Sequence, residues 1–159
     1  MKKICFSLVA VTILAVSGCK SSSTSTDSYV KYDTECLGVE LDGSQTVRAW
    51  GQGRNKSDAK EQARKNAVYD VVFKGISSGS GECNIKPLVF DVNAHEKYEE
   101  YFNKFFRDNG DYKKYVSDKD APGGSKMLQS NASGQKYGIV VRVKRSELQE
   151  RLKSDGIVK

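Results

Sequence analysis

The clearest apolar pattern in the middle of the chain has the period of an α-helix. Alanines recur every four residues from Ala59 to Ala67, and valines continue the stripe toward Lys74. We predict a helix that begins at a cap on Asn55, runs to about Lys74 and ends at Gly75. Because alanine side chains are short, such a stripe favours a helix that lies close to a sheet.

A second predicted helix carries the most amphipathic pattern in the sequence. It begins at Asn93 and ends at Asn109-Gly110. Its apolar face consists of Ala94, Tyr98, Tyr101, Phe102, Phe105 and Phe106. We interpret this face as core, because a helix so amphipathic normally buries its apolar side. The alternative is a partner-binding surface that includes Tyr98, Tyr101 and Phe105.

Strand patterns lie on either side of these helices. Residues 34–40 and 45–51 flank Asp42-Gly43, a dipeptide that tolerates the backbone of a tight turn, and together they predict a β-hairpin. Apolar residues occupy every second position of segment 137–143, at Tyr137, Ile139, Val141 and Val143. The segment is apolar enough to predict a central strand.

The remaining segments are shorter or more polar. Residues 85–92 are apolar but contain a proline, which predicts an edge strand or an extended segment. Residues 112–117 predict a short strand, and residues 118–134 predict an exposed loop. A last short helix is predicted from a cap at Ser146 to Gly156. The fold class that follows is a single α+β domain with a mainly antiparallel sheet.

Gly51-Gln52-Gly53 precedes the first helix and invites comparison with a phosphate-binding loop. A dinucleotide fingerprint needs a third glycine, and a Walker loop ends in Gly-Lys followed by Ser or Thr. The sequence has neither feature, so no nucleotide cofactor is expected. We interpret the two glycines as letting the strand bend tightly into the helix.

Residues 1–18 have the composition of a lipoprotein signal peptide. Two lysines precede an apolar run from Ile4 to Val16, and Ser17-Gly18 leads into Cys19. The apolar run is shorter than the about 20 residues of a membrane-spanning helix. We expect cleavage before Cys19 and lipidation of its side chain, which would anchor the protein in a membrane. The alternative is an ordinary secretory signal beside a coincidental cysteine.

Residues 19–33 are rich in Ser and Thr and are expected to tether the folded domain, residues 34–159, to the membrane. Some bacterial lipoproteins carry an acidic run after the lipidated cysteine as a cue for export to the cell surface. No such run follows Cys19. We therefore expect the bacterial outer membrane, with the domain facing the periplasm. The expected partners are the membrane, through the lipid, and a protein of the cell envelope.

The charge of the chain argues against nucleic acid as a partner. The sequence has 26 basic and 20 acidic residues, a net charge of +6, and removal of residues 1–18 takes away two lysines and leaves +4. The basic residues of segment 56–65 lie beside Asp58 and Glu61. This mixture is typical of a solvated helix face, whereas a nucleic-acid site needs a concentrated basic patch.

Two cysteines remain once the signal peptide and the lipid site are set aside. Cys5 leaves with the signal peptide and Cys19 carries the lipid, so Cys36 and Cys83 are left in an oxidising compartment. Two such cysteines most often form a disulfide. A metal site is the alternative, but two thiols and the single histidine, His95, are too few for a typical zinc site.

No arrangement of residues in the sequence indicates catalysis. His95 falls in the exposed first turn of a predicted helix, where a solvated surface histidine is the simplest interpretation. Gly75-Ile-Ser-Ser-Gly79 has the Gly-x-Ser-x-Gly spacing, but it follows the predicted helix in a Gly/Ser loop, whereas a nucleophile elbow joins a strand to a helix. No spacing is typical of a histidine-based triad. We therefore expect no catalytic residues, no metal and no cofactor.

Three segments together resemble the LPP-twenty lipoprotein family. They are the Gly51-x-Gly53 strand end, the alanine-striped helix within 58–67, and the late strand Tyr137-x-Ile-Val-Val-Arg-Val. That family is similar to the N-terminal domain of a flagellar assembly protein. The resemblance implies a small α+β domain in which a curved sheet packs around one long helix. It brings no catalytic residues, and residues 87–117 are more elaborate than the family's minimum.

Two classes of function are compatible with these features. The first is a non-enzymatic outer-membrane lipoprotein that acts as a binding or scaffolding module of the envelope. The second is a membrane-anchored inhibitor or immunity protein that blocks an envelope-directed enzyme. An inhibitor would insert a protruding loop into an active site, for which residues 118–134 are the candidate, whereas a scaffold would present an apolar patch or a sheet edge.

Overall fold

The computed structural model describes residues 32–83, 86–118, 126–131 and 134–159. Lys31–Lys159 forms one compact unit of helices and strands, which confirms the predicted α+β class. The predicted signal peptide, residues 1–18, and the predicted lipid site, Cys19, lie outside the described residues.

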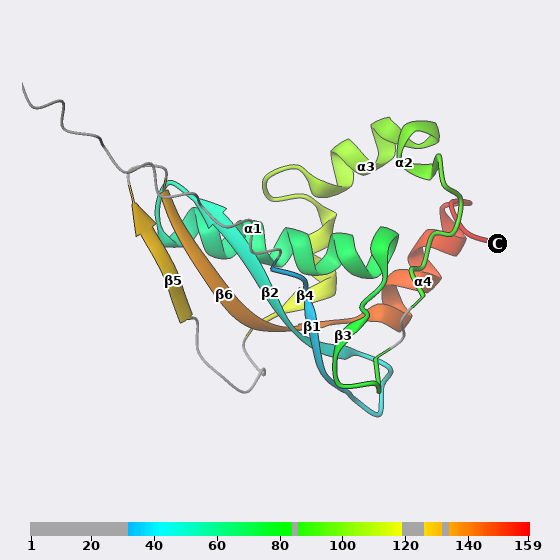
Figure 1. Cartoon of the computed structure of the whole chain (residues 1–159). Coiled ribbons are helices and arrows are strands. Elements are labelled where there is room, and N and C mark those ends of the chain that lie inside the picture. The colour runs from blue at the N-terminus through cyan, green and yellow to red at the C-terminus, as the bar shows by residue number, and fades with distance from the viewer. Residues whose placement is uncertain (1–31, 84–85, 119–125, 132–133) are drawn as a thin grey trace, which may run out of the picture. The chain divides into compact units, whose positions relative to one another are not determined.

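A mixed sheet forms the framework of the domain (Figure 1). Its strands within the described residues are β1 (Glu35–Val39), β2 (Gln45–Gly53), β3 (Ser78–Gly79), β4 (Val116–Ser117), β5 (Lys126–Asn131) and β6 (Gly134–Val143). Their order is β3-β1-β2-β6-β4, and β5 also pairs with β6. These pairings are antiparallel except that of β1 with β3.

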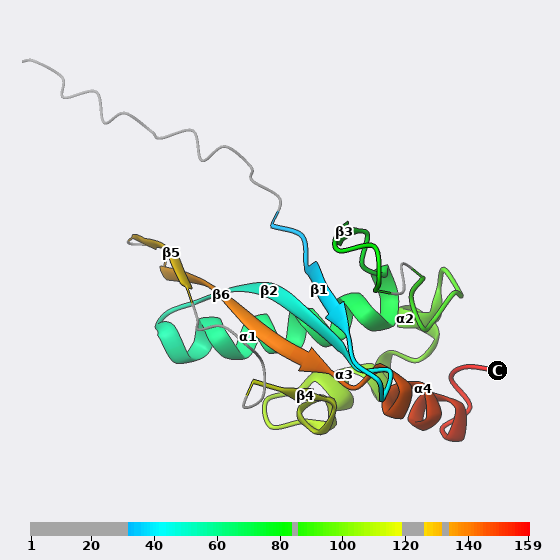
Figure 2. The same cartoon turned by 90° about the horizontal axis from the view of Figure 1, so that it is seen from below.

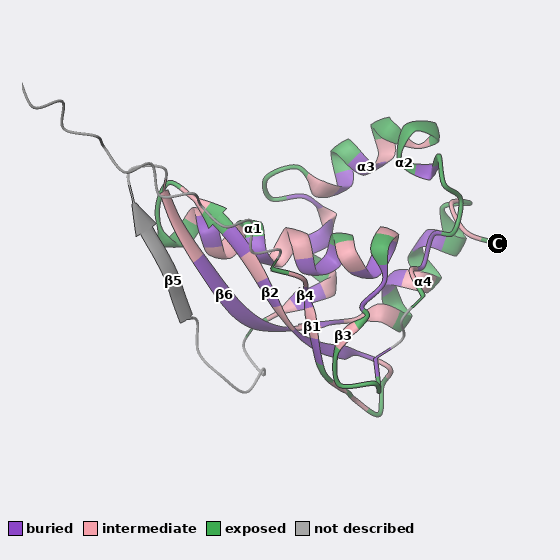
Figure 3. Cartoon of the chain, in the orientation of Figure 1, coloured by how far each residue is buried: buried purple, intermediate pink, exposed green. Residues whose placement is uncertain are grey.

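Helical segments account for most of the remaining described chain. They are α1 (Lys56–Tyr69), a π-helix (Asp70–Lys74), α2 (Ala94–Lys97), α3 (Glu99–Phe106), a 3₁₀-helix (Asp111–Tyr115) and α4 (Arg145–Ser154). Helix α1 crosses one face of β2 and β6 (Figures 1 and 2). Buried residues of α1, β2 and β6, drawn in purple in Figure 3, form the centre of the core.

The contact between α1 and β2 is unusually close because neither element places a large side chain in it. Ala59, Ala63 and Ala67 of α1 are fully buried. A Cβ atom on Gly51 would overlap the backbone of Ala59 and Ala63, and one on Gly53 would overlap the start of the helix. The interpretation of these glycines as a bend is therefore wrong. Both lie within β2, where they let two backbones touch.

Both ends of the first helical run follow the sequence prediction. The Asn55 side chain accepts hydrogen bonds from the backbone N–H groups of Ser57 and Asp58, at 2.9 and 3.0 Å. The run ends at Gly75, whose φ of 77° suits glycine. Its last five residues, Asp70–Lys74, are π-helical.

The segment after Lys86 completes the hydrogen bonding of this helix end. The N–H groups of Leu88 and Val89 donate to the carbonyl oxygens of Val71 and Val72, at 3.1 and 2.9 Å. These carbonyl groups lie in the last turn, where a helix cannot satisfy them itself. Residues 86–92 form no strand in the structure, and the chain bends at Lys86 and Leu88, so the predicted edge strand is not observed.

The predicted hairpin and central strand are confirmed. Strands β1 and β2 pair around a turn in which the Asp42 carboxylate accepts a hydrogen bond from the Ser44 N–H at 2.9 Å. The whole length of β2 pairs with β6, from Gly53↔Gln135 to Gln45↔Val143. Strand β6 also pairs with β4 and β5, which makes it central.

The prediction of one continuous second helix is wrong. The chain leaves helical geometry at Tyr98, with φ −116° and ψ 33°, which separates α2 from α3. The Asn93 side chain makes no capping hydrogen bond, so the first turn lacks the support that the sequence pattern suggested. Helix α3 ends at Phe106, before the predicted stop at Asn109-Gly110.

Three further predictions need correction. Residues 111–115 form a 3₁₀-helix and only 116–117 a strand, because Tyr112 turns inward and is completely buried. Part of the predicted loop 118–134 is strand β5, paired with β6. Ser146 lies inside α4, whose N-cap residue is Lys144, and the helix begins where β6 ends.

Cys36 and Cys83 form a disulfide, as predicted. Their Cα atoms are 5.8 Å apart and both side chains are buried. The bond joins β1 to the segment that follows β3 and closes a loop across 47 positions of sequence. In the chain-entropy model, a loop of this length contributes about 4 kcal/mol to the free energy of unfolding.

We predict that Gly51→Ala destabilises the domain by about 3 kcal/mol, because the added methyl group overlaps the backbone of α1. Gly81→Ala is the matched control, since a Cβ atom there meets nothing within 4 Å. It should change the free energy of unfolding by less than about 1 kcal/mol. Chemical denaturation of the two variants measures the difference, and equal stabilities would contradict the close contact.

Candidate binding site

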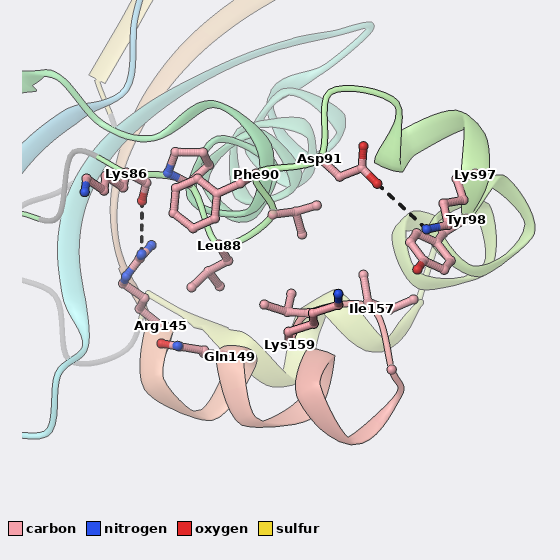
Figure 4. A pocket seen from close by; sticks show the side chains of 14 residues that line it. Lys86, Leu88, Phe90, Asp91, Lys97, Tyr98, Arg145, Gln149, Ile157 and Lys159 are labelled. Carbon is pink, nitrogen blue, oxygen red and sulfur yellow. Dashed lines mark hydrogen bonds and ion pairs between the residues drawn. The ribbon is translucent and has the colours of Figure 1, made fainter.

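A pocket of about 590 Å³ opens between segment 86–91, α2, the start of α4 and residues 156–159 (Figure 4). Its lining residues are Lys86, Pro87, Leu88, Val89, Phe90, Asp91, Lys97, Tyr98, Arg145, Gln149, Gly156, Ile157, Val158 and Lys159. This volume lies in the range of about 300–1,000 Å³ that is typical of small-molecule sites.

Helix α4 places two polar side chains in the pocket. Arg145 and Gln149 are four residues apart and therefore share one face of the helix. Leu148 and Leu152 occupy another face, where both are completely buried in the core. The packing of the leucines thus fixes the rotation of the helix and turns Arg145 and Gln149 toward the pocket.

The pocket combines apolar walls with a basic rim. Leu88 and Ile157 contribute apolar surface, and Phe90 is 66% exposed at the edge. Four basic residues line the pocket, namely Lys86, Lys97, Arg145 and Lys159. Asp91 is the lining acidic side chain, and it pairs with Lys97 at 3.8 Å. The balance of charge favours an anionic ligand.

A second pocket of about 370 Å³ adjoins the first. It is lined by Val39, Gly43, Gln45, Glu82, Arg145, Ser146 and Gln149. Since Arg145 and Gln149 line both pockets, the first turn of α4 forms the boundary between them. We call the two together the α4 pocket pair.

Two buried polar atoms of the α4 pocket pair lack hydrogen bonds within the described structure. They are Oε1 of Gln45 and Nη1 of Arg145. The Gln45 side chain is only 1% exposed, so water outside the protein does not compensate its carbonyl oxygen. Unpaired buried groups of this kind are costly, about 1–3 kcal/mol each, and suggest a site that a ligand or water completes.

The guanidinium of Arg145 has an unusual environment. Its Nη2 donates a hydrogen bond to the carbonyl oxygen of Lys86 at 3.0 Å, but no ion pair to Arg145 occurs among the described residues. Burial lowers the pKa of Arg145 below its ordinary value. A half-buried cation without a counter-ion favours the binding of an anion.

The predicted partner surface on the aromatic helix is divided by the structure. Phe105 is buried, with 4% exposure, which removes it from any partner surface. Tyr101 is partly buried and its hydroxyl donates to Asp155 at 2.6 Å; burial and this bond raise the pKa of Tyr101. Tyr98 lines the larger pocket, so it remains close to the candidate site.

His95 is exposed, in agreement with its predicted surface position, and its ring packs against that of Phe73 at a centroid distance of 5.4 Å. In the described residues, no group of three or more His, Cys, Asp and Glu side chains is arranged to hold a metal ion. Each helix in that part of the chain is too short or too polar to cross a bilayer.

Sequence reasoning missed the two polar residues at the centre of the α4 pocket pair. Arg145 gave no signal, because a basic residue in a first helical turn is usually solvated. The position of Gln45 was weakly indicative, since it shares the inward face of its strand with Val47 and Ala49. An amide in the inward series of a half-buried strand is a candidate for a buried polar role.

A second polar cluster lies on α1 and has a structural explanation. The carboxylate of Glu61 accepts hydrogen bonds from the Tyr112 hydroxyl and from Arg64, and it pairs with Lys113 at 2.9 Å. Arg64 also binds Asp118. We call these residues the Glu61 network. Its polar groups are paired with one another, and it joins α1 to the 3₁₀-helix and β4.

No family model, curated protein or solved structure matches the chain. The evidence for the candidate site is therefore its geometry.

We predict that the Glu61 network makes stability depend on pH. Burial alone would raise the pKa of Glu61, but Tyr112, Lys113 and Arg64 together lower it below its ordinary 4.5. The stabilisation is therefore present above pH 4.5 and is lost as the pH falls through the folded-state pKa. Glu61→Gln should lower the free energy of unfolding by about 1 kcal/mol at pH 7.

Melting temperatures measured below pH 4.5 test this prediction more directly than the stability at pH 7. Melting temperatures of the Glu61→Gln variant should fall less steeply below pH 4.5 than those of the wild type. Some slope should remain, because a hydrogen bond from Arg64 lowers the pKa of Asp118 as well. Glu150→Gln, on the exposed side of α4, is the control and should keep the wild-type profile. Parallel profiles for all three proteins would refute the prediction.

Proposed function

We propose that the protein is a lipid-anchored, non-enzymatic binding module of the bacterial cell envelope. The observation that carries this proposal is the α4 pocket pair, in which the buried Gln45 and the half-buried Arg145 each have an unpaired polar atom near an apolar wall. Sites that bind ligands typically combine apolar walls with a few convergent polar groups. The signal-peptide pattern that ends at Ser17-Gly18-Cys19 supports a lipid anchor, and the lack of an acidic run after Cys19 supports an outer-membrane position facing the periplasm.

We also propose the finer description of the fold, an LPP-twenty-like domain whose sheet curves around an alanine-striped helix. The close contact of Gly51 with Ala59 and Ala63 supports it, because it involves the segments that carry the resemblance. The disulfide between Cys36 and Cys83 is consistent with an oxidising compartment such as the periplasm.

The anchor is tested by Cys19→Ala. We expect the wild-type protein to remain with washed membranes and the variant to be released, because it lacks the acyl chains that bury in the bilayer. Cys5→Ala is the matched control: this cysteine lies in the predicted signal peptide, so its loss should leave the mature protein membrane-bound. Immunoblots of membrane and soluble fractions give the readout. A Cys19→Ala protein that stays on membranes after washing would disprove the anchor.

The binding function is tested by photo-crosslinking in intact cells. A benzophenone amino acid in place of Phe90, exposed at the edge of the larger pocket, should form an adduct with an envelope partner. The same group in place of Arg54, whose side chain is 95% exposed outside the pocket pair, should not. Adducts at both positions, or at neither, would contradict the proposal. Capture of an enzyme by a third probe placed within residues 118–134, the segment predicted for an inhibitor, would instead support the alternative, an anchored inhibitor.

A further inference from the structure

We infer that the α4 pocket pair binds a short peptide segment that carries a carboxylate next to an apolar side chain. The inference rests on the proposed binding function and specifies the class of ligand. Three features near the first turn of α4 carry it. They are the cation of Arg145, the buried acceptor of Gln45 and the apolar wall that includes Leu88 and Ile157.

Arg145 supplies the position for the carboxylate. Its Nη2 is held by the carbonyl oxygen of Lys86, while Nη1 has no partner within the described structure. Nη1 is buried, so the guanidinium must rotate before it reaches a ligand in either of the two pockets that Arg145 lines, and Nη1 itself has no hydrogen bond to give up. Arginine binds carboxylates through charge-assisted hydrogen bonds, and Lys159 adds positive charge nearby.

Gln45 distinguishes a peptide from other carboxylates. Its unpaired Oε1 is an acceptor and therefore needs a donor from the ligand. A peptide provides a backbone N–H beside its carboxylate, whereas a fatty acid has no such donor. One water molecule, with about 30 Å³ of liquid volume, would leave most of a 370 Å³ pocket for a larger group.

The larger pocket accepts the apolar side chain. Leu88 and Ile157 line the pocket in Figure 4 and would contact this side chain. Phe90 lies at the rim, with 66% of its surface exposed. Burial of apolar atoms here removes surface from water on both partners. Because Arg145 and Gln149 line both pockets, a single ligand can reach all three features.

The test uses the full lipidated chain in micelles of a neutral detergent and two peptides. Acetyl-Ala-Leu-Leu with a free carboxylate should bind in the millimolar range or tighter by isothermal titration calorimetry. The same peptide with a C-terminal amide should bind about tenfold more weakly. Hexanoate, an apolar carboxylate without an N–H donor, should also bind at least about tenfold more weakly than the free peptide.

Two variants that each remove one positive charge from α4 locate the site. Arg145→Gln should weaken binding of the free peptide about tenfold, and Lys153→Gln, on the exposed side of the helix, should change it less than about twofold. Gln45→Met should reduce the preference for the peptide over hexanoate. Melting temperatures within a few degrees of wild type confirm that the variants are folded.

The outcomes separate this inference from the proposed function. Equal binding of acid and amide peptides, equal binding of hexanoate, or no binding of the free peptide would each overturn the ligand class. A crosslinked partner at Phe90 together with any of these results would leave the binding function standing. Absence of a crosslinked partner with selective peptide binding would overturn the envelope function and keep the site.

Discussion

The backbone of α1 lies directly on the backbone of β2, and the rest of the domain depends on that contact. Gly51 and Gly53 leave no Cβ atoms between the two elements, and Ala59 and Ala63 add only methyl groups. The Asn66 side chain strengthens the contact by donating to the carbonyl oxygen of Trp50 at 2.7 Å. So close a contact gains dispersion attraction between the two backbones. The height of α1 above the sheet then determines how deep the surrounding core can be.

Local sequence patterns predicted the elements whose conformation is decided locally. The helix from Asn55 and the turn at Asp42-Gly43 are determined by capping and turn chemistry within a few residues. The role of Gly51 was not predictable in this way, because a glycine suits a bend and a close helix contact equally well. Only the partner helix decides between them. For the same reason Tyr112 was assigned to a strand, although its bond to Glu61 requires it to turn inward.

The candidate site was less predictable than the fold. The pairing of Cys36 with Cys83 followed from compartment and count. The α4 pocket pair is built instead from segments far apart in the sequence, so the spacing of residues within any one segment does not predict it. Arg145 is a candidate ligand-binding residue only because its guanidinium is half-buried and has no acidic partner in the described structure. Burial and missing partners are properties of the folded chain, which a sequence pattern does not report.

The same strand register that builds the core also builds the candidate site. Gln45 pairs with Val143, and Arg145 follows two residues later, so the register of β2 against β6 brings the two polar groups to one end of the sheet. A slip of one residue would turn Gln45 to the opposite face and expose the buried series of β2. Such a slip would cost more free energy in the core than at the pocket. The packing of the sheet therefore holds the backbone of the site in place. A ligand would therefore meet a backbone already in place, and the ordering cost of binding would be limited to side chains such as Arg145.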